Sequence, residues 1–559
     1  MKNYSSAFAV ILIFGIVVLS SCSKKSGDKG ITSGQVIATE KLFDLTLTNS
    51  ERDSMISTLE NQLSDYKIIH SQLIDNSVPP SLWFNPVPAN VVYDEIQKQI
   101  DWKLPANVNL PTNIKDISFY SVADISVLVR TRKISSVELT RFFLERLKKY
   151  GDTLHCVVTL TEERAIKMAQ KADDEIARGI YRGPLHGIPY GIKDLFAVDG
   201  YKTTWGAAPY KDQVINADAT VVKKLDEAGA VLVAKFSLGS LAMDDVWFGG
   251  MTRNPWDLNQ GSSGSSAGSA AATSAGLVPF SIGTETWGSI VSPCNRCGVT
   301  GLRPTYGRIS RAGGMALSWS MDKVGPICRS AFDCALVFNA LRGSDRVDQS
   351  ATDYPFNYNA SVDVKKLRVG YLKSLFDNNN ENHTNDSIAL NEIRNMGINL
   401  IPLALPDSAT IPVKSLALIL VAESAAAFDD LTRSNKDDEL SLQDKNAWPN
   451  IFRAAQFIPA VQYIQANRLR YKLIQEMYAA VKDFDVIITP SFGGNQMLLT
   501  NLTGNPCVVV PNGFDKTGHP TSISFIGNLY DEATLLVFAK AYQDITQHDN
   551  QVPPLFKPE

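Results

Sequence analysis

Residues 259–293 read NQGSSGSSAGSAAATSAGLVPFSIGTETWGSIVSP, and this stretch decides how the middle of the chain folds. A Gly/Ser loop leads into a helix of small residues, then into an apolar strand and a second Gly-containing turn that carries Ser289. A flexible linker has no reason to continue into such a helix and strand, so we interpret the loop as part of a site. Two hydroxyls and a row of backbone N–H groups would then face one point, as acyl transfer requires.

Lys193 lies upstream, in the apolar and Gly-rich segment GIPYGIKDLF at residues 187–196. One interpretation is a lysine at a strand edge that pairs with an acidic side chain. The other is a desolvated lysine whose lowered pKa makes it a usable base near neutral pH. The sequence leaves both open.

Together these segments resemble the amidase signature family. Residues 192–194 match its Ile-Lys-Asp segment, residues 263–269 match its Gly/Ser loop, and residues 283–291 match its second turn. The separation of 24 residues between Ser265 and Ser289 also agrees with the family. Flanking matches extend the resemblance over about residues 120–550; they lie at residues 253–258, 297–305, 322–326, 500–506 and 518–520.

The resemblance implies a mechanism. Ser289 is the nucleophile, and Ser265, in a cis peptide, relays its proton to neutral Lys193. The backbone N–H groups that form the oxyanion hole belong to Thr286, Trp287, Gly288 and Ser289. The substrate is a small-molecule or peptide amide, which loses ammonia or an amine. Neither a cofactor nor a metal is implied.

Three residues depart from the family pattern. Glu285 replaces the usual Asp, Trp287 replaces a Gly, and Val291 replaces the usual Arg, as in a peptide-amidase-like branch. A backbone donor is unaffected by its side chain, so Trp287 still fits the oxyanion hole. Its side chain either restricts the pocket or packs into the core.

The fold class follows from alternating strand and helix patterns. We predict an α/β fold, with a central mixed and mostly parallel β-sheet covered by helices on both faces and with an N-terminal helical extension. Apolar strands are expected at residues 231–233, 278–282, 486–488, 507–511 and 522–526, and helices at residues 135–150 and 532–542. The more polar residues 345–450 are expected outside the sheet.

The predicted domain boundaries are residues 1–21, a lipoprotein signal peptide; 22–37, a flexible tether; 38–117, the helical extension; and 118–555, the catalytic domain. Lys2, an apolar run and the sequence Leu-Ser-Ser-Cys ending at Cys22 resemble a bacterial lipobox. This implies lipid modification of Cys22 and export to the cell envelope, in the periplasm or at the outer membrane of a Gram-negative bacterium. An ordinary signal peptide is the alternative.

In the extension, residues 48–51 form a capping-box pattern that predicts an amphipathic helix. The Pro-rich residues 78–88, which carry Leu82, Trp83 and Phe84, cannot continue it. We interpret them as a strap that holds an aromatic plug on the main domain, with an exposed aromatic patch for a partner as the alternative.

A net charge of −4 and an isoelectric point near 6.0, without a basic run, disfavour a nucleic-acid partner. Of seven cysteines, Cys294 and Cys297 have C-x-x-C spacing but no second pair or nearby histidine that would indicate zinc. A redox pair and buried free thiols both remain possible.

The leading hypothesis is a lipid-anchored hydrolase of linear carboxamides. An alternative is the glutamine-amidohydrolase-type A subunit of a tRNA-dependent amidotransferase, which the export signal disfavours. A non-catalytic lipid-anchored binding protein on an amidase fold is a further alternative, disfavoured by the intact Lys193, Ser265 and Ser289. The sequence predicts neither the oligomeric state nor the acyl and amine specificity.

Overall fold

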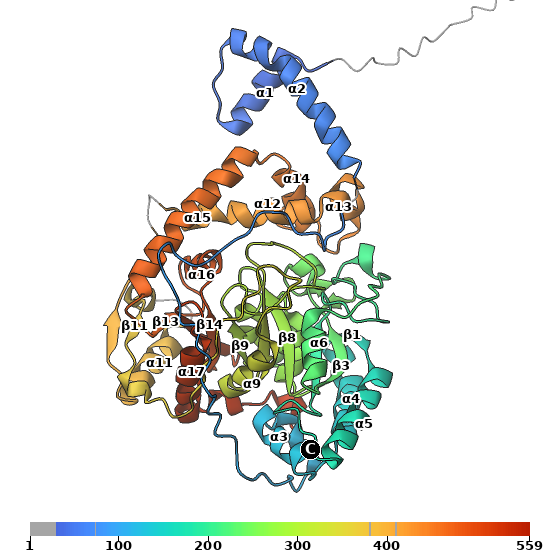
Figure 1. Cartoon of the computed structure of the whole chain (residues 1–559), viewed down its shortest axis with the longest axis vertical. Coiled ribbons are helices and arrows are strands. Elements are labelled where there is room, and N and C mark those ends of the chain that lie inside the picture. The colour runs from blue at the N-terminus through green and yellow to red at the C-terminus, as the bar shows by residue number, and fades with distance from the viewer. Residues whose placement is uncertain (1–29, 73, 379–381, 408–410, 559) are drawn as a thin grey trace, which may run out of the picture. The chain divides into compact units, whose positions relative to one another are not determined.

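The computed structural model describes residues 30–72, 74–378, 382–407 and 411–558 (Figure 1). The chain forms two compact units, Met1–Leu73 and Ile74–Glu559. The expected boundary at residue 117 is therefore wrong, because residues 74–117 pack with the larger unit. The predicted signal peptide and Cys22 lie outside the described residues.

The smaller unit contains two helices, α1 (Ser33–Phe43) and α2 (Asn49–His70). The predicted capping box at the start of α2 is confirmed, since Thr48 and Glu51 bond reciprocally. Because α1 begins at Ser33, the expected tether is wrong for residues 33–37. An ion pair of 2.6 Å between Arg52 and Glu40 joins the two helices.

Helices and strands alternate through the larger unit. Its helices are α3 (Val122–Arg130), α4 (Ser136–Leu154), α5 (Glu162–Ala177), α6 (Thr220–Glu227), α7 (Ala267–Ser274), α8 (Val291–Cys297), α9 (Ala331–Leu341), α10 (Lys373–Phe376), α11 (His383–Asn395), α12 (Leu418–Ala427), α13 (Asp429–Arg433), α14 (Trp448–Ala455), α15 (Ala460–Val481), α16 (Gln496–Thr503) and α17 (Glu532–Thr546). The strands of its main sheet are β1 (Val157–Leu160), β2 (Pro189–Lys193), β3 (Val231–Phe236), β8 (Phe280–Glu285), β9 (Thr300–Arg303), β10 (Lys323–Cys328), β11 (Val369–Tyr371), β12 (Leu400–Pro402), β13 (Val486–Pro490), β14 (Cys507–Phe514) and β15 (Pro520–Gly527). Two small sheets pair β4 (Val246–Trp247) with β5 (Gly250–Met251) and β6 (Arg253–Asn254) with β7 (Asp257–Gly261).

The main sheet has eleven strands, in the order β1-β3-β2-β8-β10-β9-β14-β15-β13-β11-β12 among the described residues. The α/β class and the mixed sheet are confirmed, but the parallel share is smaller than expected. Pairing is parallel between β2 and β3, β2 and β8, β11 and β12, and β11 and β13. The other six neighbouring pairs are antiparallel. Two of them, β9 with β10 and β14 with β15, join strands that are consecutive in the main sheet.

The sheet separates two apolar cores. Along β14, Val508 and Val510 enter one core and Val509 enters the other, as the alternation of side chains across a strand requires. One core contains residues of α4, α5, α7 and α8, and the other contains residues of α3, α9, α12 and α17. The expectation of helices on both faces is thus confirmed, and Figure 1 shows α4 and α5 beside β3 and β1.

Helix α7 packs unusually close to its neighbours because its side chains are small. Every residue of α7 is buried. A Cβ on Gly268 would lie 2.6 Å from the carbonyl oxygen of Cys156 and the backbone nitrogen of Ser237, so only glycine fits there. The sequence AGSAAATS therefore brings the start of α7 directly against the sheet.

The region around residues 345–450 does not lie wholly outside the sheet, as the sequence led us to expect. It contributes β11 and β12, which form one edge of the sheet in parallel with β13. Each of these strands has only three residues, which is too short for a clear pattern of alternation.

The strap interpretation of the Pro-rich segment is confirmed at Phe84. Its ring meets that of Tyr306 edge to face at 4.9 Å, and the guanidinium carbon of Arg470 lies 3.5 Å from its centroid. Leu82 and Trp83 are exposed.

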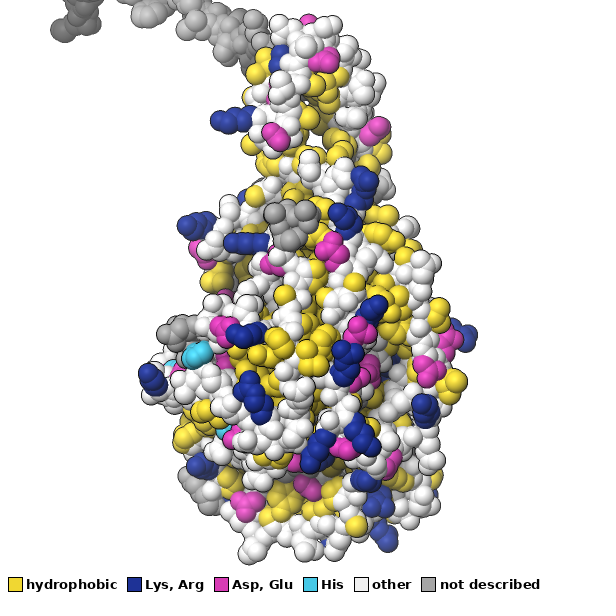
Figure 2. All heavy atoms as spheres, turned by 90° about the vertical axis from the view of Figure 1, so that its left-hand side faces the viewer, with side chains coloured by type: hydrophobic (Ala, Val, Ile, Leu, Met, Phe, Trp, Pro, Cys, Tyr) yellow, Lys and Arg dark blue, Asp and Glu magenta, His cyan; other side chains and the backbone are white. Residues whose placement is uncertain are grey.

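None of the described helices is both long and apolar enough to cross a bilayer. On the face shown in Figure 2, Lys and Arg side chains are interspersed with Asp and Glu rather than gathered in one patch.

Candidate active site

Lys193 is the last residue of β2, a strand between two parallel neighbours, and it is fully buried. Its Nζ lies 2.8 Å from Ser265 Oγ, 3.2 Å from Ser266 Oγ and 2.8 Å from Thr284 Oγ1. All of these partners are hydroxyls. The carboxyl end of β2 thus meets the Gly/Ser loop and the end of β8 at one point.

The electrostatics of Lys193 follow from this setting. Burial lowers the pKa of Lys193 to about 7, an effect that the charges of Asp322 and Glu285 oppose. The alternative interpretation, a lysine paired with an acidic side chain, does not apply to Lys193 but does describe Lys235. Lys235 is buried on β3 and forms an ion pair of 2.8 Å with Asp194.

Ser265 lies in a tightly constrained loop just before α7. The peptide bond between Gly264 and Ser265 is cis, as the family resemblance implied. A Cβ on Gly264 would lie 1.8 Å from the carbonyl oxygen of Asp244, so glycine is required. The backbone N–H of Ser263 donates to Asp245 Oδ2 at 2.7 Å and anchors the loop.

The turn that carries Ser289 is held by Glu285. Its Oε2 accepts the backbone N–H groups of Ile290 at 2.9 Å and Val291 at 3.0 Å. Its Oε1 meets Arg303 Nη1 at 2.7 Å and accepts from Asn501 Nδ2 at 2.9 Å. Burial alone would raise the pKa of Glu285, but Arg303 and these hydrogen bonds outweigh burial and lower it.

Arg303 and Asn501 are positioning residues that our sequence reasoning missed. Both lie in the flanking segments that match the family, at residues 297–305 and 500–506. That match was the available signal, but nothing local indicates that both side chains converge on Glu285. Only the pairing of β9 with β14, with α16 just before β14, brings them together.

Ser289 is half-buried, and its carbonyl oxygen accepts the backbone N–H of Ser266 at 3.1 Å. This bond joins the two turns. Within the described part of the chain, the Ser289 hydroxyl and the backbone N–H groups of Trp287, Gly288 and Ser289 have no hydrogen-bond partner. Free donors in a row are what an oxyanion requires. The structure links Lys193 directly to Ser265, and links Ser289 to this pair through the backbone.

Thr286 and Trp287 differ in their surroundings. The Thr286 hydroxyl donates to Asp322 Oδ1 at 2.6 Å. The side chain of Trp287 is 42% exposed, so the alternative in which it packs into the core is wrong.

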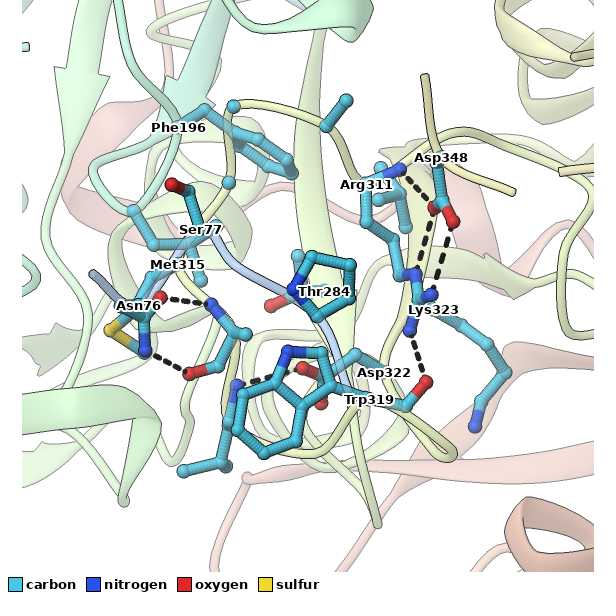
Figure 3. A pocket seen from close by; sticks show the side chains of 18 of the residues that line it. Asn76, Ser77, Phe196, Thr284, Arg311, Met315, Trp319, Asp322, Lys323 and Asp348 are labelled. Atoms are coloured by element: carbon cyan, nitrogen blue, oxygen red, sulfur yellow. Dashed lines mark hydrogen bonds and ion pairs between the residues drawn. The ribbon is translucent and has the colours of Figure 1, made fainter. Parts of the chain in front are cut away.

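A cavity of about 320 Å³ lies beside this constellation, with Thr284 and Thr286 in its wall (Figure 3). Much of the wall is apolar and includes Phe196, Met315 and Trp319. The described charged groups in the wall are Arg311, Asp322, Lys323 and Asp348, and each has a polar partner within the protein. Lys323 Nζ donates to the carbonyl oxygen of Met321, and burial lowers the pKa of Lys323 well below its usual range. Arg311 Nε meets Asp348 at 2.9 Å, and Asp322 Oδ2 accepts two backbone N–H groups.

All six described cysteines, including Cys294 and Cys297, are buried and free, which confirms the interpretation as buried thiols. Burial raises the pKa of both thiols. In the described part of the chain no group of three His, Cys, Asp or Glu side chains could hold a metal ion.

Comparison with known proteins gives consistent results. The Amidase family matches residues 138–499. The chain is 31% identical to the A subunit of glutamyl-tRNA(Gln) amidotransferase from Thioalkalivibrio sulfidiphilus, covering 78% of this chain and 99% of the relative. It is 33% identical to the corresponding protein of Dechloromonas aromatica, covering 78% and 98%.

Among solved structures, native peptide amidase from Stenotrophomonas maltophilia is similar with 28% identity and a TM-score of 0.69, covering 78% of this chain and 99% of that one. With residues 138–499 matched and relatives above 30% identity aligned over nearly their whole length, the chain belongs to the amidase signature family of enzymes that act on amide C–N bonds.

Proposed function

We propose that the chain hydrolyses a linear carboxamide through an acyl-enzyme on Ser289, with Ser265 as the proton relay and Lys193 as the base. One observation carries the proposal: the hydrogen-bond partners of the fully buried Lys193 among the described residues are all hydroxyls, and its pKa is lowered to about 7. A neutral amine at this position can accept a proton at neutral pH.

In the proposed reaction, Ser289 Oγ bonds to the amide carbon while its proton passes to Ser265, whose own proton passes to Lys193. The negative oxygen of the tetrahedral intermediate accepts the backbone N–H groups of residues 286–289. The C–N bond then breaks as the relay returns the proton to nitrogen, which leaves as ammonia or an amine. Water attacks the acyl-enzyme by the same route and frees Ser289.

The substrate is then a small-molecule or peptide amide, with no nucleic-acid partner. The wall of the neighbouring cavity supports this class, because its described charged groups already have partners within the protein. Arg311 pairs with Asp348, Asp322 accepts two backbone N–H groups, and Lys323 donates to the carbonyl oxygen of Met321. A glutamine carries an ammonium and a carboxylate, and each would need a partner of opposite charge.

A second candidate is the A subunit of a tRNA-dependent amidotransferase, favoured by the names of the relatives at 31% and 33% identity. Release of ammonia from free glutamine, compared with release from hydrophobic primary amides, distinguishes the two candidates. Preference for glutamine by at least tenfold in kcat/KM would favour this second candidate.

The mechanism is tested by Ser289→Ala and Lys193→Ala, which should each abolish amide turnover, with Cys294→Ala as a control that retains it. A fluorophosphonate should label Ser289, as read by peptide mass spectrometry. Full activity in either of the first two variants would refute the mechanism. Absence of both labelling and turnover would instead favour the non-catalytic binding protein.

We further propose that Cys22 is lipidated and that the protein is anchored at the cell envelope. The support is the sequence Leu-Ser-Ser-Cys after an apolar run. In a Gram-negative host, labelled palmitate should enter the full chain and not Cys22→Ala, and cell fractionation should move that variant away from the membrane. Equal labelling of both would show that Cys22 is not the acceptor.

A further inference from the structure

One wall of the cavity beside the candidate active site comes from a segment far away in sequence. Asn76, Ser77 and Pro79 line it together with residues of the loop between β9 and β10 (Figure 3). These three residues precede the segment that matches the Amidase family, which begins at residue 138. This wall therefore comes from a part of the chain that lies outside the match to the family.

Asn76 fastens this wall to the loop by a reciprocal pair of hydrogen bonds. Its Nδ2 donates to the carbonyl oxygen of Ala316 at 3.0 Å, and the backbone N–H of Ala316 donates to its Oδ1 at 2.8 Å. The same Nδ2 also lies 3.3 Å from the carbonyl oxygen of Ala427. An asparagine that replaces a backbone partner in this way holds two loops at a fixed distance.

The next residues are ordered by Asp75. The backbone N–H and the hydroxyl of Ser77 both donate to Asp75 Oδ1, at 2.8 and 2.5 Å. These bonds, from the Ser77 side chain first and its backbone second, lower the pKa of Asp75. The bend therefore presents Ser77 and Pro79 to the cavity in one conformation.

The chemistry of the cavity indicates what it holds. Around the wall, Arg311 donates to Asp348, to Ser350 Oγ at 2.8 Å and to the carbonyl oxygen of Trp319 at 2.6 Å. The polar side chains Thr284, Thr286 and Lys323 also line the cavity and have partners in Lys193, Asp322 and the carbonyl oxygen of Met321. Much of the remaining surface is that of Phe196, Met315 and other apolar side chains. An uncharged apolar group gains from burial in such a site, whereas a charged group would lose its hydration without a partner.

We infer that residues 75–79 are a specificity wall that selects amides with an uncharged apolar group next to the scissile bond. Its effect on turnover rests on the proposed amidase function, but its effect on binding does not. Asn76 acts here as a positioning residue, and Ser77 and Pro79 supply surface to the ligand.

The first experiment compares Asn76→Ala with Asn85→Ala in the full chain. Asn85 lies further along the same segment, and among the described residues its side chain bonds only to the backbone N–H of Val87 at 2.9 Å, so it is a matched control. With 3-phenylpropionamide or N-benzylacetamide, Asn76→Ala should raise KM about tenfold, as expected for the loss of one apolar contact surface. KM for acetamide, which carries no such apolar group, should rise much less, and Asn85→Ala should match the wild type throughout.

The two aromatic amides distinguish whether the apolar group belongs to the acyl or the amine side. A larger rise in KM for one or both of them than for acetamide supports the inference. Equal losses for acetamide and both aromatic amides would indicate a merely structural strap and overturn it. Unchanged KM values for all three would overturn it as well.

The second experiment measures binding without turnover. Calorimetric titration with 4-phenylbutan-2-one, an uncharged ketone that cannot be hydrolysed, should give a Kd about tenfold weaker for Asn76→Ala. Ser77→Trp should fill the cavity and abolish this binding. If the wild type hydrolyses no amide but these binding results hold, the proposed function fails and the inference stands. If Ser77→Trp binds the ketone like the wild type, the inference fails.

Discussion

Replacement of Lys193 by methionine tests whether this lysine is neutral in the folded protein. Methionine has a similar length and no charge, so it fits the buried position. Burial lowers the pKa of Lys193 from 10.5 to about 7. The folded protein then binds fewer protons at this residue than the unfolded chain between these values, so its stability rises with pH across that window.

The magnitude follows from the two pKa values. Relative to a residue that does not titrate, a lysine with this shift costs the folded state about 4 kcal/mol at pH 7 and about 2 kcal/mol at pH 9. The lost hydrogen bonds to Ser265 and Thr284 reduce the stability of the variant at both pH values. From pH 7 to pH 9, the free energy of unfolding of the wild type should therefore increase by about 2 kcal/mol relative to that of Lys193→Met.

Urea titrations at the two pH values measure this difference, with amide turnover assayed on the same samples. Lys148→Met removes an exposed lysine whose partner is Glu162 and serves as the control for other pH effects. Lys193→Met should show no turnover at either pH. A stability difference that stays constant from pH 7 to pH 9 would mean that Lys193 is charged in the folded protein, and the neutral base would be refuted.

Three further predictions concern the same site. In the wild type, kcat/KM should fall about tenfold for each unit below the Lys193 pKa of about 7 and level off above it, because only the neutral amine accepts a proton; a flat profile from pH 5 to 8 would contradict this base. Glu285→Gln should lower the free energy of unfolding by about 3 kcal/mol, since it leaves Arg303 buried without its charged partner. The same variant should lower kcat more than it raises KM. Glu162→Gln, which removes the charge of an exposed ion pair, should change neither stability nor kinetics. Cys294→Ala should retain turnover, and the native thiols should react with a disulfide reagent only after unfolding, whereas rapid native reaction would show that the cysteines are accessible.

Much of the fold could be predicted because its signals are local. The helix predicted at residues 135–150 is α4, which begins with a capping box of Ser135 and Glu138. The apolar runs at residues 231–233 and 486–488 lie in fully buried strands. The predicted ends are less accurate, since α4 continues to Leu154, because a helix end depends on what the next turn packs against. The strand partners were harder still, because pairing direction depends on connections rather than on the strands themselves.

Parts of the candidate site were likewise beyond prediction. The sequence indicated Ser265 and Lys193 through motifs, and the structure brings them to 2.8 Å. Nothing in the sequence placed Asn76 beside Ala316, because the two are 240 residues apart and neither lies in a motif. The position of the cavity wall depends on how residues 75–79, which form no helix, pack against the folded domain.

Lys193 and Lys235 together show what the sequence determines and what the tertiary structure decides. Both lysines follow apolar residues, in GIK and VLVAK, and by itself the sequence determined only that each belongs to an apolar segment. The tertiary structure decided their chemistry, since it places Asp194 against Lys235 and hydroxyls alone against Lys193. A neighbouring carboxylate stabilises an ammonium, whereas hydroxyls in a dry site do not replace its hydration, and for that reason Lys193 is the one suited to act as a base.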